Sequence, residues 1–162
     1  AVLVDNTTNL VISSAHNEII RQKNPTKHAE MLLIEKACKK KDSKYLTNTS
    51  IFITLEPCAM CASAISEVQI NKIYFGAYDE KKGSLESIMK IYNTKNYFVP
   101  DVYGGINEIE CSKILKKFFK EKCNYLFSAT EYEHPIQRAF YLNKKNRIKM
   151  FDSGKFFKRK WM

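Results

Sequence analysis

Short apolar runs alternate with longer mixed stretches along the chain, which indicates strands separated by helices. Residues 1–4 and 10–12 are β-prone and flank a turn-rich stretch at residues 5–9, so they predict a hairpin. Residues 51–55 form a nearly continuous apolar run, typical of a strand that is buried on both faces of a sheet. Further strands are predicted at residues 72–77 and 97–99.

Helix signals lie between these strands. Asn24 and Pro25 fit the N-cap and the first position of a helix that runs to the lysines at residues 39–41. His28 then falls in its first turn or just beyond it. Pro57 ends the strand at residues 51–55 and begins the next helix.

Two more helices are predicted in the second half of the chain. The apolar spacing of residues 85–92, after Gly83, indicates a short amphipathic helix. Asn107 and Glu110 resemble a capping pair, and the apolar stripe that follows has helical spacing as far as residue 119. Strands that alternate with helices predict an α/β protein built as a three-layer α/β/α sandwich.

Length and cysteine content suggest one intracellular catalytic domain. The 162 residues are enough for a hydrophobic core without disulfides. No stretch approaches the roughly 18 uninterrupted apolar residues of a membrane span, and the first residues show no signal-peptide pattern. Five cysteines, two of them at metal-ligand spacing, fit a reducing compartment. We therefore expect a cytoplasmic protein without a membrane partner.

The net charge of +10 is concentrated at the C-terminal end. Residues 138–162 hold nine Lys or Arg and one acidic residue, Asp152, which together supply +8. A basic, partly aromatic tail is typical of a segment that binds nucleic acid, although a solvated terminus without a partner carries about equal weight. The pattern becomes irregular beyond Asn124. We therefore predict a domain at residues 1–123 and a basic extension of unknown structure at residues 124–162.

Two short motifs offer metal ligands. His-Ala-Glu at residues 28–30 and Pro-Cys-Ala-Met-Cys at residues 57–61 supply one imidazole and two thiolates. Zinc prefers such ligands, and three protein ligands with a fourth position for water are typical of a catalytic site. Cys58 and Cys61 share a helix face near its N-terminus, where backbone N–H groups lower thiol pKa values. We therefore expect one zinc ion per chain, held by His28, Cys58 and Cys61.

Glu30 is the candidate catalytic residue. It lies two residues after His28, on a different side of the helix, and is poorly placed as a fourth ligand. A carboxylate there can take a proton from the water that zinc activates and pass it to a substrate nitrogen. The alternative is a structural zinc knuckle or a Cys-x-x-Cys pair in a core helix. The combined His-x-Glu and Pro-Cys-x-x-Cys motifs are the known signature of zinc nucleobase deaminases, which favours the catalytic interpretation.

The motifs also carry a closer resemblance. Residues 54–64 resemble the corresponding segment of the tRNA-specific adenosine deaminases. Asn17 and the Asn-Pro-Thr at residues 24–26 lie where that family has its base-contacting Asn and the Pro-Thr that precedes His-Ala-Glu. Residues 75–83 resemble the family's Phe-Gly-Ala-x-Asp-x-Lys-x-Gly loop, and the resemblance extends over residues 1–123.

The resemblance implies a cytidine deaminase-like fold with a mixed central sheet, and hydrolytic deamination of adenosine to inosine at the tRNA wobble position with release of ammonia. It also implies a homodimer, a tRNA substrate and a substrate-binding role for Asn17, for which the alternative is an ordinary turn residue. The family's N-terminal helix is missing before Ala1. Glu67 and Gln69 replace the His and Arg of well-known members, and the basic tail matches nothing in the family.

Two other functions stay open. A deaminase of free cytosine, cytidine, deoxycytidylate or guanine would share the same zinc chemistry. A non-catalytic RNA-binding subunit with structural zinc is the third interpretation. The presence of Glu30 disfavours that third interpretation, because a purely structural metal site has no use for a proton carrier.

Overall fold

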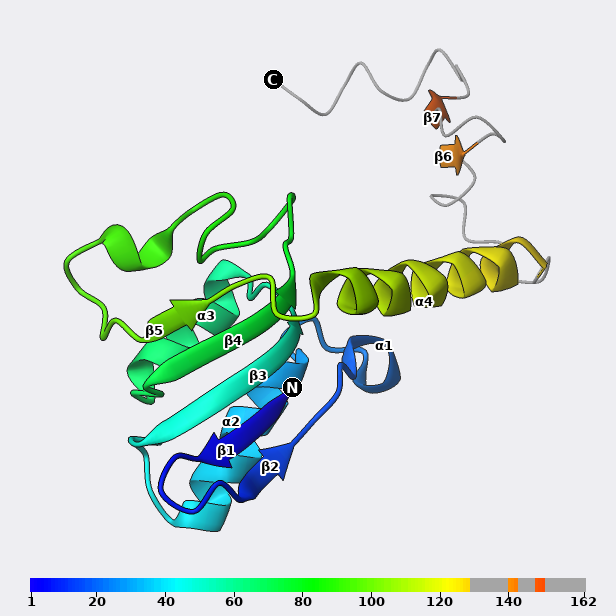
Figure 1. Cartoon of the computed structure of the whole chain (residues 1–162). Coiled ribbons are helices and arrows are strands. Elements are labelled where there is room, and N and C mark those ends of the chain that lie inside the picture. Colours follow the sequence, from blue (N-terminus) through cyan, green and yellow to red (C-terminus); the bar gives the residue numbers. More distant parts are fainter. Residues whose placement is uncertain (129–139, 143–147, 151–162) are drawn as a thin grey trace, which may run out of the picture. The chain divides into compact units, whose positions relative to one another are not determined.

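The computed structural model describes residues 1–128, 140–142 and 148–150 (Figure 1). The chain divides into two compact units, Ala1–Lys117 and Phe118–Met162. Helix α4 (Glu108–Ser128) continues through residue 123, and the domain boundary predicted there stays a prediction. In the second unit, β6 (Phe140–Leu142) and β7 (Ile148–Met150) form an antiparallel pair. The rest of the predicted basic tail lies outside the described residues.

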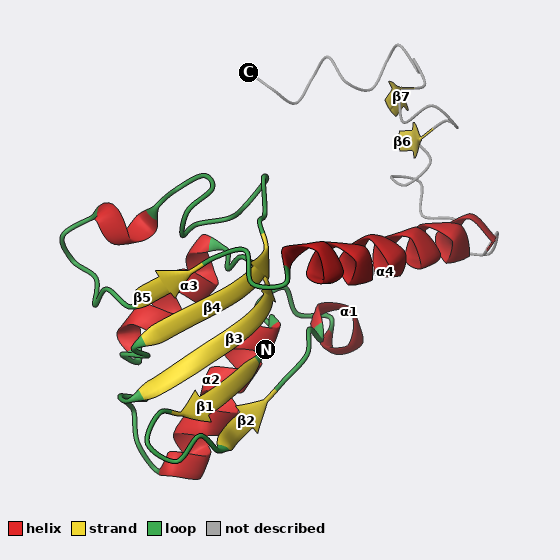
Figure 2. Ribbon diagram, in the orientation of Figure 1, coloured by secondary structure: helices red, strands yellow, loops and turns green. Residues whose placement is uncertain are grey.

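A mixed five-stranded sheet is the centre of the first unit (Figure 2). Its strand order is β2-β1-β3-β4-β5. Strand β1 pairs antiparallel with both β2 and β3, whereas β3, β4 and β5 are parallel. These pairings confirm the predicted N-terminal hairpin and the mixed α/β sheet. The strand bounds are Val2–Asp5 for β1, Val11–Ser14 for β2, Thr49–Leu55 for β3, Lys72–Ala77 for β4 and Asp101–Tyr103 for β5.

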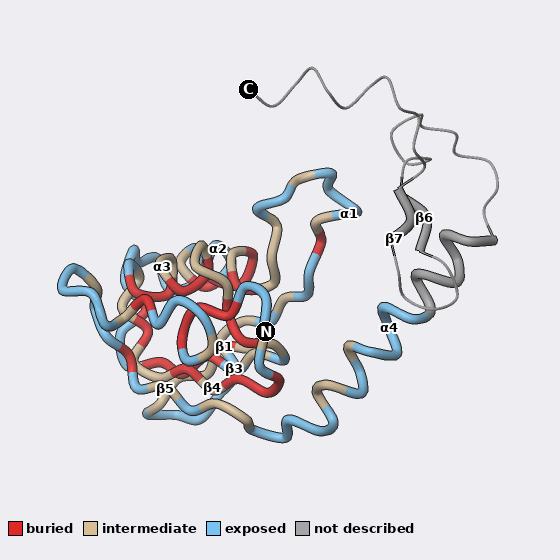
Figure 3. Tube along the Cα trace, turned by 90° about the horizontal axis from the view of Figure 1, so that it is seen from above, coloured by how far each residue is buried: buried red, intermediate tan, exposed pale blue. Residues whose placement is uncertain are grey.

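Two helices, α2 (Ala29–Lys41) and α3 (Ala59–Glu67), cover one face of this sheet. Buried residues of β3 and β4 belong to one core cluster with buried residues of α2 and α3. Figure 3 colours stretches of these elements as buried. This apolar core holds the strands in register and fixes the ends of β3 and α2 that carry the metal motifs. Its members include Leu33, Ile51, Ile65, Ile73 and Phe75.

The other face of the sheet carries a row of aromatic side chains. Phe52, Tyr74 and Tyr103 stack across β3, β4 and β5 with ring centroids 4.7 and 4.8 Å apart. Phe52 is 41% exposed, so the prediction that its strand is buried on both faces is wrong. The first turn of α4 approaches this face at Gly76, where an added Cβ would lie 2.3 Å from Cys111 Sγ.

Helix α2 begins at Ala29 and not at Asn24 as predicted. The Asn24 side chain caps a turn instead, because its Oδ1 accepts the backbone N–H of Thr26 at 2.9 Å. A short helix that the sequence analysis missed, α1 (Ile19–Gln22), precedes this turn. Local side-chain hydrogen bonds of Asn compete with helix formation in this way.

The predicted helix at residues 85–92 and the predicted strand at residues 97–99 are also wrong. Only a 3₁₀ turn, η1 (Ile91–Asn93), forms in the first region, because backbone N–H groups from residue 85 onward donate to a distant carboxylate. The segment at residues 97–99 packs on α3, where Ser66 Oγ donates to the Phe98 carbonyl at 2.8 Å. The strand forms just after it, at Asp101. No helix within the described ranges is long and apolar enough to cross a membrane.

Candidate metal centre and active site

The metal motifs sit at the first residues of two helices. His28 is the N-cap of α2 and Cys58 is the N-cap of α3, and both have an extended backbone. From these positions both side chains reach a shared point. Cys61, in the first turn of α3, is completely buried. The prediction that two helix N-termini approach one site is therefore confirmed.

The three side chains meet at distances that suit a tetrahedral zinc ion. His28 Nδ1 lies 3.8 Å from Cys58 Sγ and 3.6 Å from Cys61 Sγ. Zinc bonds of about 2.3 Å to sulfur and about 2.0–2.1 Å to nitrogen, at a tetrahedral angle, place N and S about 3.6 Å apart. Within the described part of the chain, these residues form the only His/Cys/Asp/Glu group close enough to hold a metal. The donor set and its spacing therefore fit zinc.

The pKa values of the two thiols are also compatible with a metal ion between them. A hydrogen bond from Cys61, together with backbone N–H groups and His28, lowers the pKa of Cys58 to about 5. The same bond to Cys58, burial and the nearby Glu30 raise the pKa of the Cys61 thiol. The two sulfurs therefore lie within hydrogen-bond reach of each other. A cation between them would stabilise both thiolates.

Glu30 lies beside this cluster, in the first turn of α2, and only 8% of it is exposed. Burial raises the pKa of Glu30, while its backbone N–H and His28 oppose the rise. Glu30 in turn contributes to the raised pKa of the Cys61 thiol. The structure therefore brings the predicted proton carrier and the three predicted ligands together.

Asn17 is placed differently from these four residues. It is exposed, and its Oδ1 accepts the backbone N–H of Ile19 at 3.1 Å, as in an ordinary turn. Among the described residues, no hydrogen bond joins Asn17 to the metal cluster. Its predicted role in binding the substrate stays a prediction.

Another buried carboxylate, Glu56, lies just before the Pro-Cys motif and was not among the predicted site residues. It is 2% exposed and accepts hydrogen bonds from a loop at residues 79–87. Burial alone would raise its pKa, but the hydrogen bonds from Ser87 and from backbone N–H groups outweigh burial and lower the pKa. A charged residue directly after an apolar strand was the only signal in the sequence.

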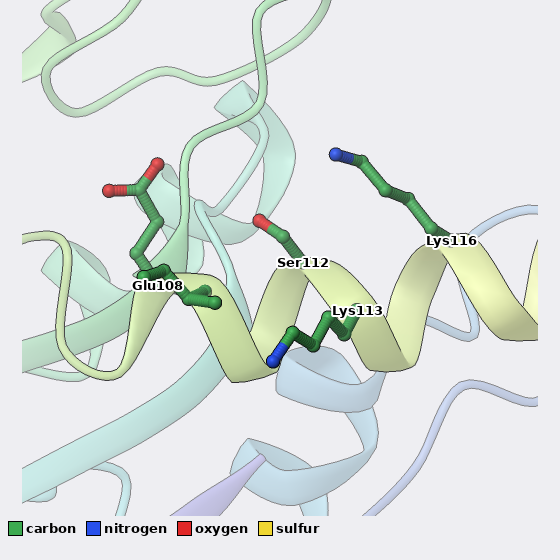
Figure 4. A pocket seen from close by; sticks show the side chains of 5 residues that line it. Glu108, Ser112, Lys113 and Lys116 are labelled. Atoms are coloured by element: carbon green, nitrogen blue, oxygen red, sulfur yellow. The ribbon is translucent and has the colours of Figure 1, made fainter.

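Two surface hollows in the described residues lie elsewhere. One, of about 430 Å³, follows a single helix, α4, and its side chains point in different directions rather than toward one centre (Figure 4). The other, of about 270 Å³, lies on the aromatic face of the sheet and includes Phe52, Tyr74 and Gly76. Neither hollow contains a residue of the metal cluster. The candidate active site is therefore identified by the side chains of the cluster and not by a surface hollow.

Comparison with known proteins agrees with this geometry. Residues 1–77 match the family model described as the cytidine and deoxycytidylate deaminase zinc-binding region. A tRNA-specific adenosine deaminase of Rickettsia bellii (strain RML369-C) is 38% identical over 122 residues, which cover 75% of this chain and 84% of that protein. A protein of the same description from Aquifex aeolicus (strain VF5) is 40% identical over 116 residues, or 70% of this chain and 76% of its own length.

Solved structures extend the comparison. One from studies of A-to-I editing by tRNA:A34 deaminases at the wobble position of transfer RNA has a TM-score of 0.67 and 37% identity, covering 70% of this chain and 81% of that chain. Guanine deaminase from Nitrosomonas europaea has a TM-score of 0.62 and 17% identity over 72% of this chain and 70% of its own, which shows the fold alone. The motifs, the fold and the extent of identity lead to one conclusion: the chain belongs to the tRNA-specific adenosine deaminase family of zinc-binding deaminases.

Proposed function

We propose that this protein converts adenosine to inosine at the wobble position of tRNA by zinc-dependent hydrolysis, with release of ammonia. The observation that carries the proposal is the His28, Cys58 and Cys61 cluster with the buried Glu30 beside it. The identity of 37–40% to proteins described as tRNA deaminases supports adenosine in tRNA over a free base. The likeness to guanine deaminase concerns the fold and adds no support for that substrate.

Each residue of the cluster has a distinct role in this proposal. His28, Cys58 and Cys61 hold one zinc ion per chain, which supplies the Lewis acidity that activates water for attack on the amino-bearing carbon of the base. Glu30 accepts a proton from that water and delivers it to the ring nitrogen. It then takes the proton that remains on the added hydroxyl and transfers it to the amino group, so that ammonia leaves and the carbonyl of inosine forms. Asn17 binds the edge of the base, because an amide both donates and accepts hydrogen bonds. We also propose a homodimer located in the cytoplasm.

The test is mass analysis of nucleosides after incubation of the protein with unmodified tRNA transcripts that have adenosine at the first anticodon position. We expect inosine to appear in step with the loss of adenosine and the release of ammonia. A transcript with guanosine at that position serves as the RNA control. Parallel incubations with free cytidine, deoxycytidylate and guanine address the alternative substrates.

The Glu30→Gln variant is the matched enzyme control because it keeps the size of the side chain. Inosine formation by this variant at the native rate would contradict the proposed mechanism. Turnover of a free base but not of tRNA would replace the proposed substrate. Light scattering of the purified protein tests the homodimer, and a monomeric mass at the enzyme concentrations that give full activity would contradict it.

A further inference from the structure

Glu56 is a buried carboxylate that has no cationic partner. In the described residues it forms no ion pair with Lys, Arg or His. Its charge is balanced by hydrogen bonds alone, because a buried carboxylate left unpaired would be costly. Oε1 accepts the backbone N–H groups of Leu85, Glu86 and Ser87 at 3.1, 2.8 and 3.0 Å. Oε2 accepts the Asp79 N–H at 3.2 Å and the Ser87 hydroxyl.

All five donors belong to the loop at residues 79–87, which we call the Glu56 loop. A single side chain therefore holds both ends of this loop, across 23 to 31 positions of sequence. The packing is close, since a Cβ added at Gly83 would lie 2.1 Å from Glu56 Oε2 and 2.6 Å from the Asp79 carbonyl oxygen. The shape of the loop and the position of the carboxylate thus depend on each other.

The Glu56 loop also contacts a metal ligand. Gly83 forms an antiparallel bridge with Cys58, and Ser84 N–H donates to the Pro57 carbonyl at 3.0 Å. Cys58 is the N-cap residue of α3 and has an extended backbone. Its extended backbone is therefore braced from outside by the loop that Glu56 holds.

We propose that Glu56 is a positioning residue for the active site, which holds the loop at residues 79–87 against Cys58 and thereby fixes the direction of this ligand's sulfur. The inference rests on the proposed function of the metal cluster and assigns one more residue to it. Groups that orient metal ligands without touching the metal typically contribute about 10–100-fold to metal affinity or activity. Glu56 performs this task through the backbone of the ligand rather than through its sulfur.

The test compares Glu56→Gln with Glu80→Gln, using the zinc-loaded protein. Glu80 is exposed in the same loop, so its substitution removes the same charge without touching the contacts described above. We expect Glu56→Gln to lose zinc to a competing chelator about 10–100-fold faster than the native protein, at a temperature at which both remain folded. We also expect altered intensity and position of the visible absorption bands after cobalt replaces zinc, because these bands report ligand geometry. Glu80→Gln should match the native protein in both measurements.

A second variant keeps the proposal testable if Glu56→Gln does not fold. Ser87→Ala removes one of the five donors, and a smaller change, of a few-fold in zinc release, is expected in the same direction. Native zinc release and native cobalt spectra in both variants, with at most a lower melting temperature, would show that Glu56 only stabilises the fold and would overturn the proposal. These measurements need no RNA. A failure of the native enzyme to deaminate tRNA would therefore refute the proposed function while leaving the result for Glu56 readable.

Discussion

At the scale of single residues, two buried carboxylates near the metal cluster have opposite surroundings. Glu56 has both oxygens occupied by five hydrogen-bond donors. Glu30 is buried beside the ligands His28 and Cys61 and raises the pKa of the Cys61 thiol. A carboxylate saturated with fixed donors is suited to holding structure, whereas one without such a shell can exchange protons with a substrate. The difference agrees with the roles proposed above, positioning for Glu56 and proton transfer for Glu30.

The first prediction follows for Glu30. Glu30→Gln should lower kcat by about 10²–10⁴-fold, because an amide cannot carry the proton between water and the base. Zinc content, measured by atomic emission, and tRNA affinity should stay near the native values, since Glu30 is not a proposed ligand. Loss of zinc in this variant would instead identify Glu30 as a ligand.

At the scale of secondary-structure elements, the metal would join the N-termini of α2 and α3. Replacement of Cys58 by Ala should therefore destabilise the protein as well as inactivate it. With free zinc at 100 times its dissociation constant, binding stabilises the native state by about 2.7 kcal/mol, and Cys58→Ala should lose about that much. Chemical unfolding with and without a chelator measures the difference.

The control for this variant is Cys38→Ala, which changes a half-buried cysteine outside the cluster. It should keep the stabilisation by zinc. A Cys58→Ala protein that is still stabilised by zinc to the native extent would show that α2 and α3 are not joined through this ligand.

A second prediction at this scale concerns the packing between β4 and α4. Gly76 leaves space for Cys111, whose Cβ would lie 2.7 Å from an added methyl group. Gly76→Ala should cost about 1–3 kcal/mol in the free energy of unfolding, because either the helix or the strand must move. Thr54→Ala, on the exposed part of the neighbouring strand, should cost less. Equal effects in urea unfolding would contradict this packing.

At the scale of the whole molecule, most of the net positive charge and the candidate metal site lie in different parts of the sequence. The ligands lie between residues 28 and 61, whereas +8 of the +10 net charge lies in residues 138–162. If this tail binds RNA, it contributes affinity and leaves the choice of nucleotide to the metal site. The tail then acts through counterion release from phosphates, which makes binding depend on salt.

Deletion of residues 138–162 should therefore weaken tRNA binding and flatten its salt dependence. The log–log slope should fall by about 0.7–0.9 for each phosphate that residues 138–162 neutralise before the deletion. The nucleotide that is converted should stay the same. Binding measured at several salt concentrations, with nucleoside analysis of the product, checks both parts. An unchanged affinity and slope would show that the tail is a solvated extension.

Much of the fold and of the site follows from local sequence. Apolar runs predicted β1, β3 and β4, and two compact motifs predicted the residues that meet in the metal cluster. Local signals suffice there because each motif lies where a helix begins, and the core between sheet and helices fixes both helix ends. The metal-binding role of these residues stays a prediction that the geometry supports.

Only the folded structure decided the remaining features, since they depend on hydrogen bonds that an apolar pattern does not report. Asn24 and Pro25 have the form of a helix start, yet they form a turn whose chain returns to Glu18 through a backbone hydrogen bond from Glu18 to Lys27. Residues 85–87 have helical spacing, yet their N–H groups bind Glu56, 29 to 31 positions earlier. A periodic pattern shows which residues are apolar. It does not show which backbone N–H groups a buried carboxylate will bind, because these depend on the fold. The sequence therefore predicted which residues meet in the cluster, and only the folded structure showed which distant contacts surround them.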